Sequence, residues 1–229
     1  MKKHIFFDLD HTIWDFDRNA EETLMALYQH YKLDELGLSS AEEFILNYTL
    51  NNHALWADYH LGKITKELLR AERFKRTFIQ MGILPELVPM QFEEDYVRLS
   101  PTKTNLFEGS IKVLEYLQSR YQLHIITNGF KETTITKMNL SGLNPYFRQV
   151  IISEDVGYNK PHPNVFQYAL EKADAKLEES IMIGDSLEAD IYGAQNFGMD
   201  AIFFNPLRKE KPADVQREIY HLEELLIHF

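Results

Sequence analysis

The sequence predicts an α/β core built as a doubly wound parallel sheet, with a helical segment inserted after the first strand. Five short apolar runs are nearly continuous in hydrophobicity, which is typical of parallel strands buried on both faces. Helical patterns alternate with these runs in the second half of the chain, whereas residues 16–99 show helical patterns and no convincing strand. With 229 residues, 45% of them hydrophobic, the chain is long enough for such a core and a smaller insert.

The elements of the core follow one another as β–α–β units. The predicted strands cover 4–10, 123–128, 150–154, 181–185 and 201–205. The helices expected between them cover 110–120, 133–140, 163–173 and 189–197. Pro163 suits the first turn of a helix, and Gly142 and Gly198 suit helix C-termini. Residues 205–214 carry two prolines and mixed charge, which predicts a loop before a C-terminal amphipathic helix.

The insert has its own helical patterns. An apolar stripe at helical spacing is formed by Leu24, Leu27, Tyr28 and Tyr31. Residues 40–43 have the form of a capping box, and further helices fit 54–61, 65–81 and 89–98. Because this stretch is too long for a βα loop, we expect an α-helical cap domain over 16–99. The core would then comprise 1–15 and 100–229, with the cap over the carboxyl edge of its sheet.

Composition excludes several classes of function. The formal net charge of -11 argues against a general nucleic-acid-binding surface, although local cations can still bind a small phosphorylated molecule. The absence of cysteine excludes disulfides, thiolate catalysis and cysteine-ligated zinc. No segment has the length of a membrane span and the N-terminus lacks a signal-peptide pattern, so we expect a soluble, cytoplasmic protein.

An acid pair, Asp8 and Asp10, follows the first predicted strand. Alternation along a strand places the two side chains on the same face. Two carboxylates so close repel each other unless a cation or a proton intervenes, which suggests a divalent metal with one carboxylate left to attack an electrophile. Taken alone, the pattern also fits an ordinary turn, since Asp favours turns and helix N-caps.

Three further strand ends carry polar residues that suit phosphate chemistry. Thr127-Asn128-Gly129 offers a hydroxyl and backbone N–H groups, Lys160-Pro161 offers a positive charge, and Asp185, with Asp190 after it, offers carboxylates. Each motif alone has a simple structural reading as a turn, a solvated lysine or a helix N-cap. Four consecutive strand ends that all carry such groups indicate a shared site, because parallel strands end at the same edge of the sheet.

The motifs in this order resemble those of the haloacid dehalogenase superfamily, which has a Rossmann-like core. The resemblance covers the whole core, and the helical insert agrees with members that carry a C1 cap. It implies that Asp8 is the nucleophile that forms an aspartyl-phosphate, while Asp10 protonates the leaving alcohol and then activates water. It also implies that Thr127, Asn128, Gly129 and Lys160 bind the phosphate.

The same resemblance implies Mg²⁺ as the cofactor. The metal would be held by Asp8, the backbone carbonyl of Asp10 and Asp185, with Asp190 nearby or acting through water. Dehalogenase members lack an aspartate two residues after the nucleophile, because cleavage of a carbon–halogen bond needs no protonated leaving group. Asp10 therefore favours a phosphatase over a haloacid dehalogenase. It also disfavours a phosphate-ligand sensor, which needs no acid at this position.

The insert and the motifs around it resemble a narrower group, the bacterial noncanonical pyrimidine 5′-nucleotidases. This resemblance implies a nucleoside monophosphate as the substrate, and a small sugar phosphate or phosphoglycolate is the alternative. Trp56 and Tyr59 would supply flat apolar faces for the base, Asn52 would supply polar partners, and Phe130 would help to enclose the ligand. The alternative is that these aromatic residues form only the core of the cap.

Overall fold

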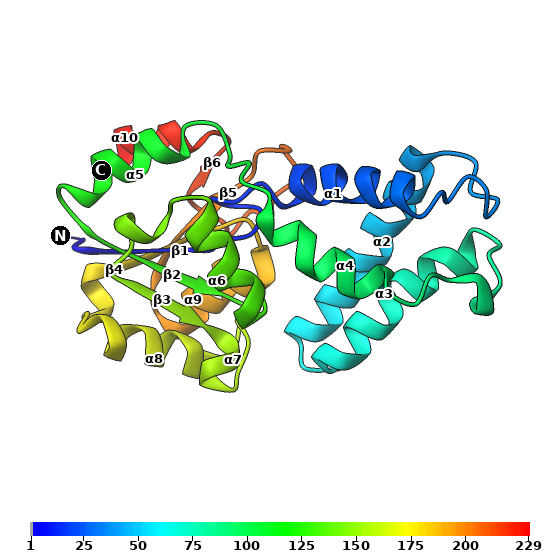
Figure 1. Ribbon diagram of the computed structural model, residues 1–229. Coiled ribbons are helices and arrows are strands. Elements are labelled where there is room, and N and C mark those ends of the chain that lie inside the picture. The colour runs from blue at the N-terminus through cyan, green and yellow to red at the C-terminus, as the bar shows by residue number, and fades with distance from the viewer. Residues whose placement is uncertain (1) are drawn as a thin grey trace. The chain divides into compact units, whose positions relative to one another are not determined.

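The computed structural model describes residues 2–229, which divide into two compact units (Figure 1). The core unit consists of residues 2–15 and 104–229. The helical unit is Phe16–Lys103, so it ends four residues later than the boundary that we expected from the sequence. No helix within residues 2–229 combines the length and the apolar character that crossing a membrane requires.

The core unit contains a six-stranded sheet in the order β3-β2-β1-β4-β5-β6, and every pair of neighbours is parallel. The strands are β1 (His4–Phe7), β2 (Gln122–Thr127), β3 (Gln149–Ile152), β4 (Ser180–Gly184), β5 (Asp200–Phe204) and β6 (Glu218–Ile219). β1 lies between β2 and β4, with Phe7 aligned to Ile125 and Ile183. The predicted doubly wound fold is therefore confirmed, and the carboxyl ends of β1, β2 and β4 meet at one edge.

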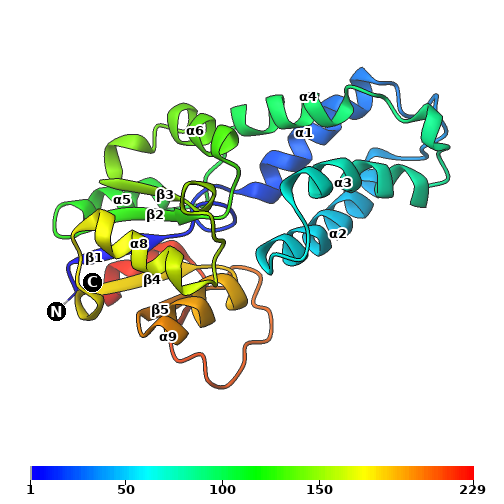
Figure 2. The same ribbon diagram turned by 90° about the horizontal axis from the view of Figure 1, so that it is seen from below.

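Helices cover both faces of this sheet. α5 and α10 lie on one face and α8 and α9 on the other (Figures 1 and 2). The α-helices of the core unit are α5 (Ser110–Gln118), α6 (Lys131–Leu140), α7 (Ser153–Val156), α8 (Pro163–Ala173), α9 (Gly193–Phe197) and α10 (Leu225–His228). A π-helical segment, η5 (Leu187–Tyr192), precedes α9, and 3-10 turns cover η3 (Asn144–Tyr146), η4 (Leu177–Glu179) and η6 (Leu222–Glu224).

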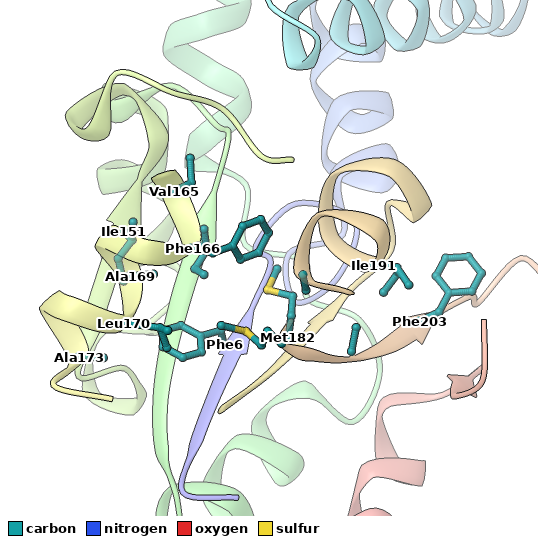
Figure 3. Packing of buried hydrophobic residues seen from close by; sticks show 14 of the residues in the cluster. Phe6, Ile151, Val165, Phe166, Ala169, Leu170, Ala173, Met182, Ile191 and Phe203 are labelled. Carbon is teal, nitrogen blue, oxygen red and sulfur yellow. The ribbon is translucent and has the colours of Figure 1, made fainter. Parts of the chain in front are cut away.

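The face under α8 shows why these segments pack together. Val165, Phe166 and Ala169 recur at helical spacing and point into a cluster with Phe6 and Met182 of the central strands (Figure 3). All five side chains are fully buried. Each Å² of buried apolar surface contributes about 25 cal/mol to stability. Such a cluster is therefore the main stabilising contribution to the sheet–helix interface.

The C-terminal segment differs from the prediction. The sequence predicts an amphipathic helix after residue 214, but the structure has strand β6, a 3-10 turn and the four-residue helix α10. β6 pairs with β5 through Phe203–Glu218 and Phe204–Ile219. The third predicted strand is also too long, because residues 153 and 154 begin α7. Pairing with an existing sheet edge outweighs the weak helical pattern of a short segment.

The helical unit is built from α1 (Phe16–His30), α2 (Ala41–His60), α3 (Lys66–Gln80) and α4 (Phe92–Leu99), with 3-10 turns η1 (Pro85–Leu87) and η2 (Ser100–Thr102). The Ser40 side chain accepts a hydrogen bond from the Glu43 amide at 3.1 Å, so the predicted N-terminus of α2 is correct. The core of the helical unit contains a set of aromatic side chains: Phe44, Tyr48, Phe74, Phe78, Phe92 and Tyr96.

Phe166 provides a test of the packing in the core unit. We expect Phe166→Ala to lower the free energy of unfolding by about 3–5 kcal/mol, because it leaves a cavity between α8 and the sheet. Ile227→Ala is the matched control, since Ile227 is 87% exposed and its loss should change stability by about 0.5 kcal/mol or less. Urea denaturation followed by circular dichroism measures both, and equal effects of the two substitutions would refute the packing role.

Candidate active site

The loop after β1 carries Asp8 and Asp10 and is held by its own backbone. The Asp8 amide donates to the Ile183 carbonyl of β4 at 2.9 Å, so the sheet pairing continues up to this residue. His11 then adopts a positive φ of 61°, and the Trp14 amide donates back to Leu9 at 2.8 Å. The chain therefore turns sharply at the strand end, which presents both aspartates at the carboxyl edge of the sheet.

Lys160 links two of the predicted site residues. Its ammonium lies 2.6 Å from Asp8 Oδ1 and 2.6 Å from Asp190 Oδ1, and it donates to the Ile126 carbonyl at 2.7 Å. Only 1% of Lys160 is exposed. Burial lowers the pKa of Lys160, but the charges of Asp190 and Asp8 outweigh burial and hold this pKa above its ordinary value. The lysine is therefore a permanent cation between two acids.

The Asn128 side chain holds the backbone that presents Lys160. Its amide donates to the Lys160 carbonyl and its Oδ1 accepts from the Lys160 amide, both at 2.9 Å. These two bonds tie the end of β2 to the loop before α8. The predicted phosphate role of Asn128 thus rests on its backbone, because its side chain is engaged in positioning Lys160.

Asp185 and Asp190 follow β4 and are arranged by different contacts. Thr12 donates to Asp185 Oδ1 at 3.2 Å, and the Ser186 amide donates to Asp190 Oδ2 at 3.1 Å. Any Cβ at Gly184 would overlap the Asp190 carboxylate, so glycine is required at this position. The tight approach places Asp190 directly against the end of β4.

Burial changes the ionisation of the acid group. It raises the pKa of Asp8 well above the usual range, with further increases from Asp190 and Asp185 and an opposing effect of Lys160. Burial and the charge of Asp190 also raise the pKa of Asp185 to about 7. Three carboxylates thus share one lysine, which leaves excess negative charge in a buried place.

These residues fit a divalent cation. Asp8, Asp185 and Asp190 each offer a carboxylate oxygen, and these three atoms lie within 4.8 Å of one another. Oxygen donors with excess negative charge are the ligands that Mg²⁺ prefers. Both oxygens of Asp190 already accept hydrogen bonds, from Lys160 and from the Ser186 amide. Asp8 and Asp185 are therefore better suited than Asp190 to direct contact with a metal.

Asp10, Thr127 and Gly129 lie close together. The Gly129 amide donates to Thr127 Oγ1 at 3.0 Å. A methyl group placed on Gly129 would lie 3.1 Å from Asp10 Oδ2 and 3.1 Å from Thr127 Oγ1. The acid and the hydroxyl thus both approach the bare backbone of the glycine, where a side chain would crowd them.

The structure also shows Lys137, which sequence reasoning missed. Its ammonium lies 2.6 Å from Asp10 Oδ1, and the side chain is 5% exposed. Thr12, whose side chain donates to Asp185, was not predicted as a site residue either. No sequence pattern indicates that a lysine in the middle of a predicted helix is buried. Thr12, in contrast, stands beside the acid pair, and this position indicates that it lies near the site.

The residues predicted to bind the base lie on different units. Asn52, Trp56 and Tyr59 belong to α2 of the helical unit, and Phe130 precedes α6 in the core unit. Asn52 and Tyr59 are buried, and the rings of Trp56 and Tyr59 meet edge to face at 5.4 Å. Within residues 2–229, Asn52 Oδ1 is buried and makes no hydrogen bond. Their roles toward a substrate stay predictions.

Comparison with known proteins agrees with the geometry. The family described as haloacid dehalogenase-like hydrolase matches residues 5–204. Pyrimidine 5′-nucleotidase PynA from Streptococcus pneumoniae is 35% identical over 228 residues, which cover 98% of this chain and 93% of that protein. A glyceraldehyde 3-phosphate phosphatase from Methanothermobacter thermautotrophicus is 29% identical over 216 residues, covering 93% and 90%.

Among solved structures, the putative hydrolase YfnB from Bacillus subtilis, in a crystal form bound to magnesium, aligns with a TM-score of 0.87. It is 31% identical, and the alignment covers 99% of this chain and 98% of that one. The match extends over both units of the chain, so the likeness concerns the insert as well as the core.

Lys160 provides a test of the charge arrangement. We expect Lys160→Met to lower the free energy of unfolding by about 3–5 kcal/mol in metal-free buffer, because it leaves Asp8 and Asp190 buried without their counter-ion. Lys112→Met is the control: it removes an ion pair with Glu223 in which both side chains are largely exposed, and should cost about 1 kcal/mol or less. Urea denaturation distinguishes the two, and a Lys160 variant as stable as the control would contradict the buried-charge interpretation.

Proposed function

Because the chain belongs to the haloacid dehalogenase-like hydrolase family, as its motifs predicted, we propose that it hydrolyses phosphate monoesters through an aspartyl-phosphate on Asp8. The observation that carries the proposal is the acid pair at the end of β1. Asp8 is held by a buried lysine, and Asp10 lies close to Thr127 and Gly129. These contacts support Asp8 as the nucleophile and Asp10 as the proton carrier in the proposed reaction.

Lys160 and the end of β2 would bind the phosphate. The lysine provides a fixed positive charge beside Asp8, and its backbone is held by Asn128. The Thr127 hydroxyl, which accepts from the Gly129 amide, would donate its own proton to a phosphate oxygen without adding charge. Positioning of this kind lowers the barrier because the donors are already arranged before the substrate arrives.

We propose Mg²⁺ as the cofactor, held by Asp8 and Asp185, with Asp190 acting through water and the Asp10 carbonyl as a further ligand. When bound, the metal would neutralise the excess charge of the three acids and polarise the phosphate. The donor set and the raised pKa values of Asp8 and Asp185 support this assignment. The YfnB structure with magnesium is consistent with it.

Asp10 favours phosphate-ester hydrolysis over the other reactions of the family. An alkoxide leaving group needs a proton, which Asp10 would give, whereas cleavage of a carbon–halogen bond does not need an acid there. A protein that only senses phosphate has no need of an acid beside a nucleophile. The family name alone does not decide between these chemistries, so Asp10 is the residue on which the proposal depends.

For the substrate, we propose a pyrimidine nucleoside monophosphate. The support is the identity of 35% to PynA across the whole chain and the presence of Asn52, Trp56 and Tyr59 on one helix. A buried amide oxygen without a hydrogen bond within residues 2–229 is costly unless a ligand satisfies it, and Asn52 Oδ1 is such an atom. A small sugar phosphate is the alternative, supported by the likeness to a glyceraldehyde 3-phosphate phosphatase.

The chemical step is tested by two conservative substitutions. Asp8→Asn should abolish turnover and the acid-stable incorporation of ³²P from a labelled substrate, because the amide cannot form the acyl phosphate. Asp10→Asn should bind phosphate normally and turn over about 10²–10⁴-fold more slowly. Full activity of the Asp8 variant would sink the mechanism.

The substrate is tested by initial rates with Mg²⁺ for UMP, dUMP, dTMP, purine monophosphates, sugar phosphates and phosphoglycolate. We expect the largest kcat/KM for pyrimidine nucleotides. Asn52→Ala should lower that kcat/KM while leaving hydrolysis of 4-nitrophenyl phosphate, which has no base to recognise, within about twofold. A clear preference for a sugar phosphate would replace the substrate assignment and leave the chemistry intact.

A further inference from the structure

Lys137 is a buried lysine for which the proposed reaction has no role so far. It lies in α6, and only 4% of the residue is exposed. Its ammonium lies 2.6 Å from Asp10 Oδ1 and 4.3 Å from the centre of the Trp14 ring. Lysine is rarely buried, because desolvation of its charge costs several kcal/mol that an apolar side chain does not incur. Packing alone therefore does not explain why the Lys137 ammonium is buried in spite of the free energy that its desolvation costs.

Both partners of the ammonium come from one hydrogen-bonded loop. Asp10 and Trp14 are joined by a backbone bridge, and the His11 amide donates to the Trp14 carbonyl at 3.0 Å. The Trp14 ring attracts the ammonium through its face, and the Asp10 carboxylate attracts it by charge and hydrogen bonding. Lys137 therefore fixes the Asp10 side chain against the loop that carries it.

The two oxygens of Asp10 face different partners. Oδ1 accepts from Lys137. Oδ2 lies near Gly129, as does the Thr127 hydroxyl: both oxygens lie 3.1 Å from the position of a methyl group on that glycine. One oxygen is thus held, and the other lies near residues of the proposed phosphate site.

We propose that Lys137 is a positioning residue that selects Asp10 Oδ2 as the oxygen that transfers the proton. The inference rests on the proposed phosphomonoesterase function. In the first step a bond forms between Asp8 and phosphorus, the bond from phosphorus to the ester oxygen breaks, and the proton on Oδ2 moves to that oxygen. In the second step water attacks phosphorus, one of its protons moves to Oδ2, and the Asp8–phosphorus bond breaks. Both aspartates are then restored.

The two buried lysines serve different acids. Lys160 contacts Asp8 and Asp190, whereas Lys137 contacts Asp10. Loss of Lys137 leaves the ion pair of the nucleophile and the phosphate donors in place. The loss should therefore slow proton transfer, which appears in kcat, and leave substrate binding nearly unchanged, which appears in KM when chemistry is slow.

The experiment compares Lys137→Met, Lys137→Gln and Lys137→Arg with wild type and with Lys112→Met, an exposed lysine on α5. Circular dichroism and thermal melting first establish which variants are folded, and the Gln variant carries the test if the Met variant is not. Each folded variant is assayed with Mg²⁺ on UMP, or on the substrate preferred in the screen, and on 4-nitrophenyl phosphate under pre-steady-state conditions.

We expect Lys137→Met and Lys137→Gln to lower kcat for the alkyl phosphate roughly 10- to 100-fold with KM within about twofold. Lys137→Arg should recover most of the rate, because it restores a cationic donor. Nitrophenolate leaves without help from an acid, so its release stays fast while hydrolysis of the phosphoenzyme slows. The Met or Gln variant should therefore show a burst of about one nitrophenolate per enzyme, which a general loss of structure does not produce.

Wild-type kcat in a folded Met or Gln variant would overturn the proposal, as would a loss without a burst or a loss confined to KM. Failure of the proposed function looks different. In that case the wild-type protein has no phosphatase activity, or Asp8→Asn retains it. If the wild type is active and Asp10→Asn is slow, a normal Lys137 variant rejects this inference alone.

Discussion

The ion pairs of Lys160 with Asp8 and Asp190 are the interaction on which the rest of the site depends. A buried cation is stable only if its partners and hydrogen-bond acceptors are complete, and here two carboxylates and the Ile126 carbonyl complete it. Its three partners come from the residue that follows β1, from β2 and from the segment after β4. Lys160 can make all three contacts only when the carboxyl ends of these strands lie side by side. The site therefore assembles only if the strands have this order in the sheet.

Charge balance explains why Asp8 and Asp185 hold protons more readily than exposed carboxyl groups do. One lysine does not neutralise Asp8, Asp185 and Asp190, and the raised pKa values of Asp8 and Asp185 express that deficit. A second lysine, Lys137, contacts Asp10 instead. The two buried lysines thus contact different acids, and in the proposed function the acids near Lys160 would be the ones that hold a divalent cation.

Much of this arrangement was open to prediction from the sequence, because buried parallel strands are continuous apolar runs and each motif residue follows one of them. The outer strand β6 was missed, since two residues are too few for a periodic pattern and its pairing to β5 is a tertiary interaction. Residues 187–192 form a π-helical turn where the sequence predicts a regular helix from 189 onward. Lys137 was missed because no local pattern distinguishes a buried lysine from an exposed one.

In the proposed function, the chemistry and the choice of substrate would depend on different kinds of residue. The residues around Asp8 contact only the phosphate in the proposed reaction, so they are compatible with any ester whose leaving oxygen reaches Asp10. To discriminate between phosphate esters, a protein needs groups that one ligand satisfies and another does not. A buried polar atom without a hydrogen-bond partner is such a group, because only a ligand with a matching polar atom offsets the free energy of its desolvation. Within residues 2–229, Asn52 Oδ1 on α2 is such an atom, whereas the neighbouring rings of Trp56 and Tyr59 contact each other. Aromatic area stabilises many ligands alike, so the amide is the better candidate for the choice among phosphate esters.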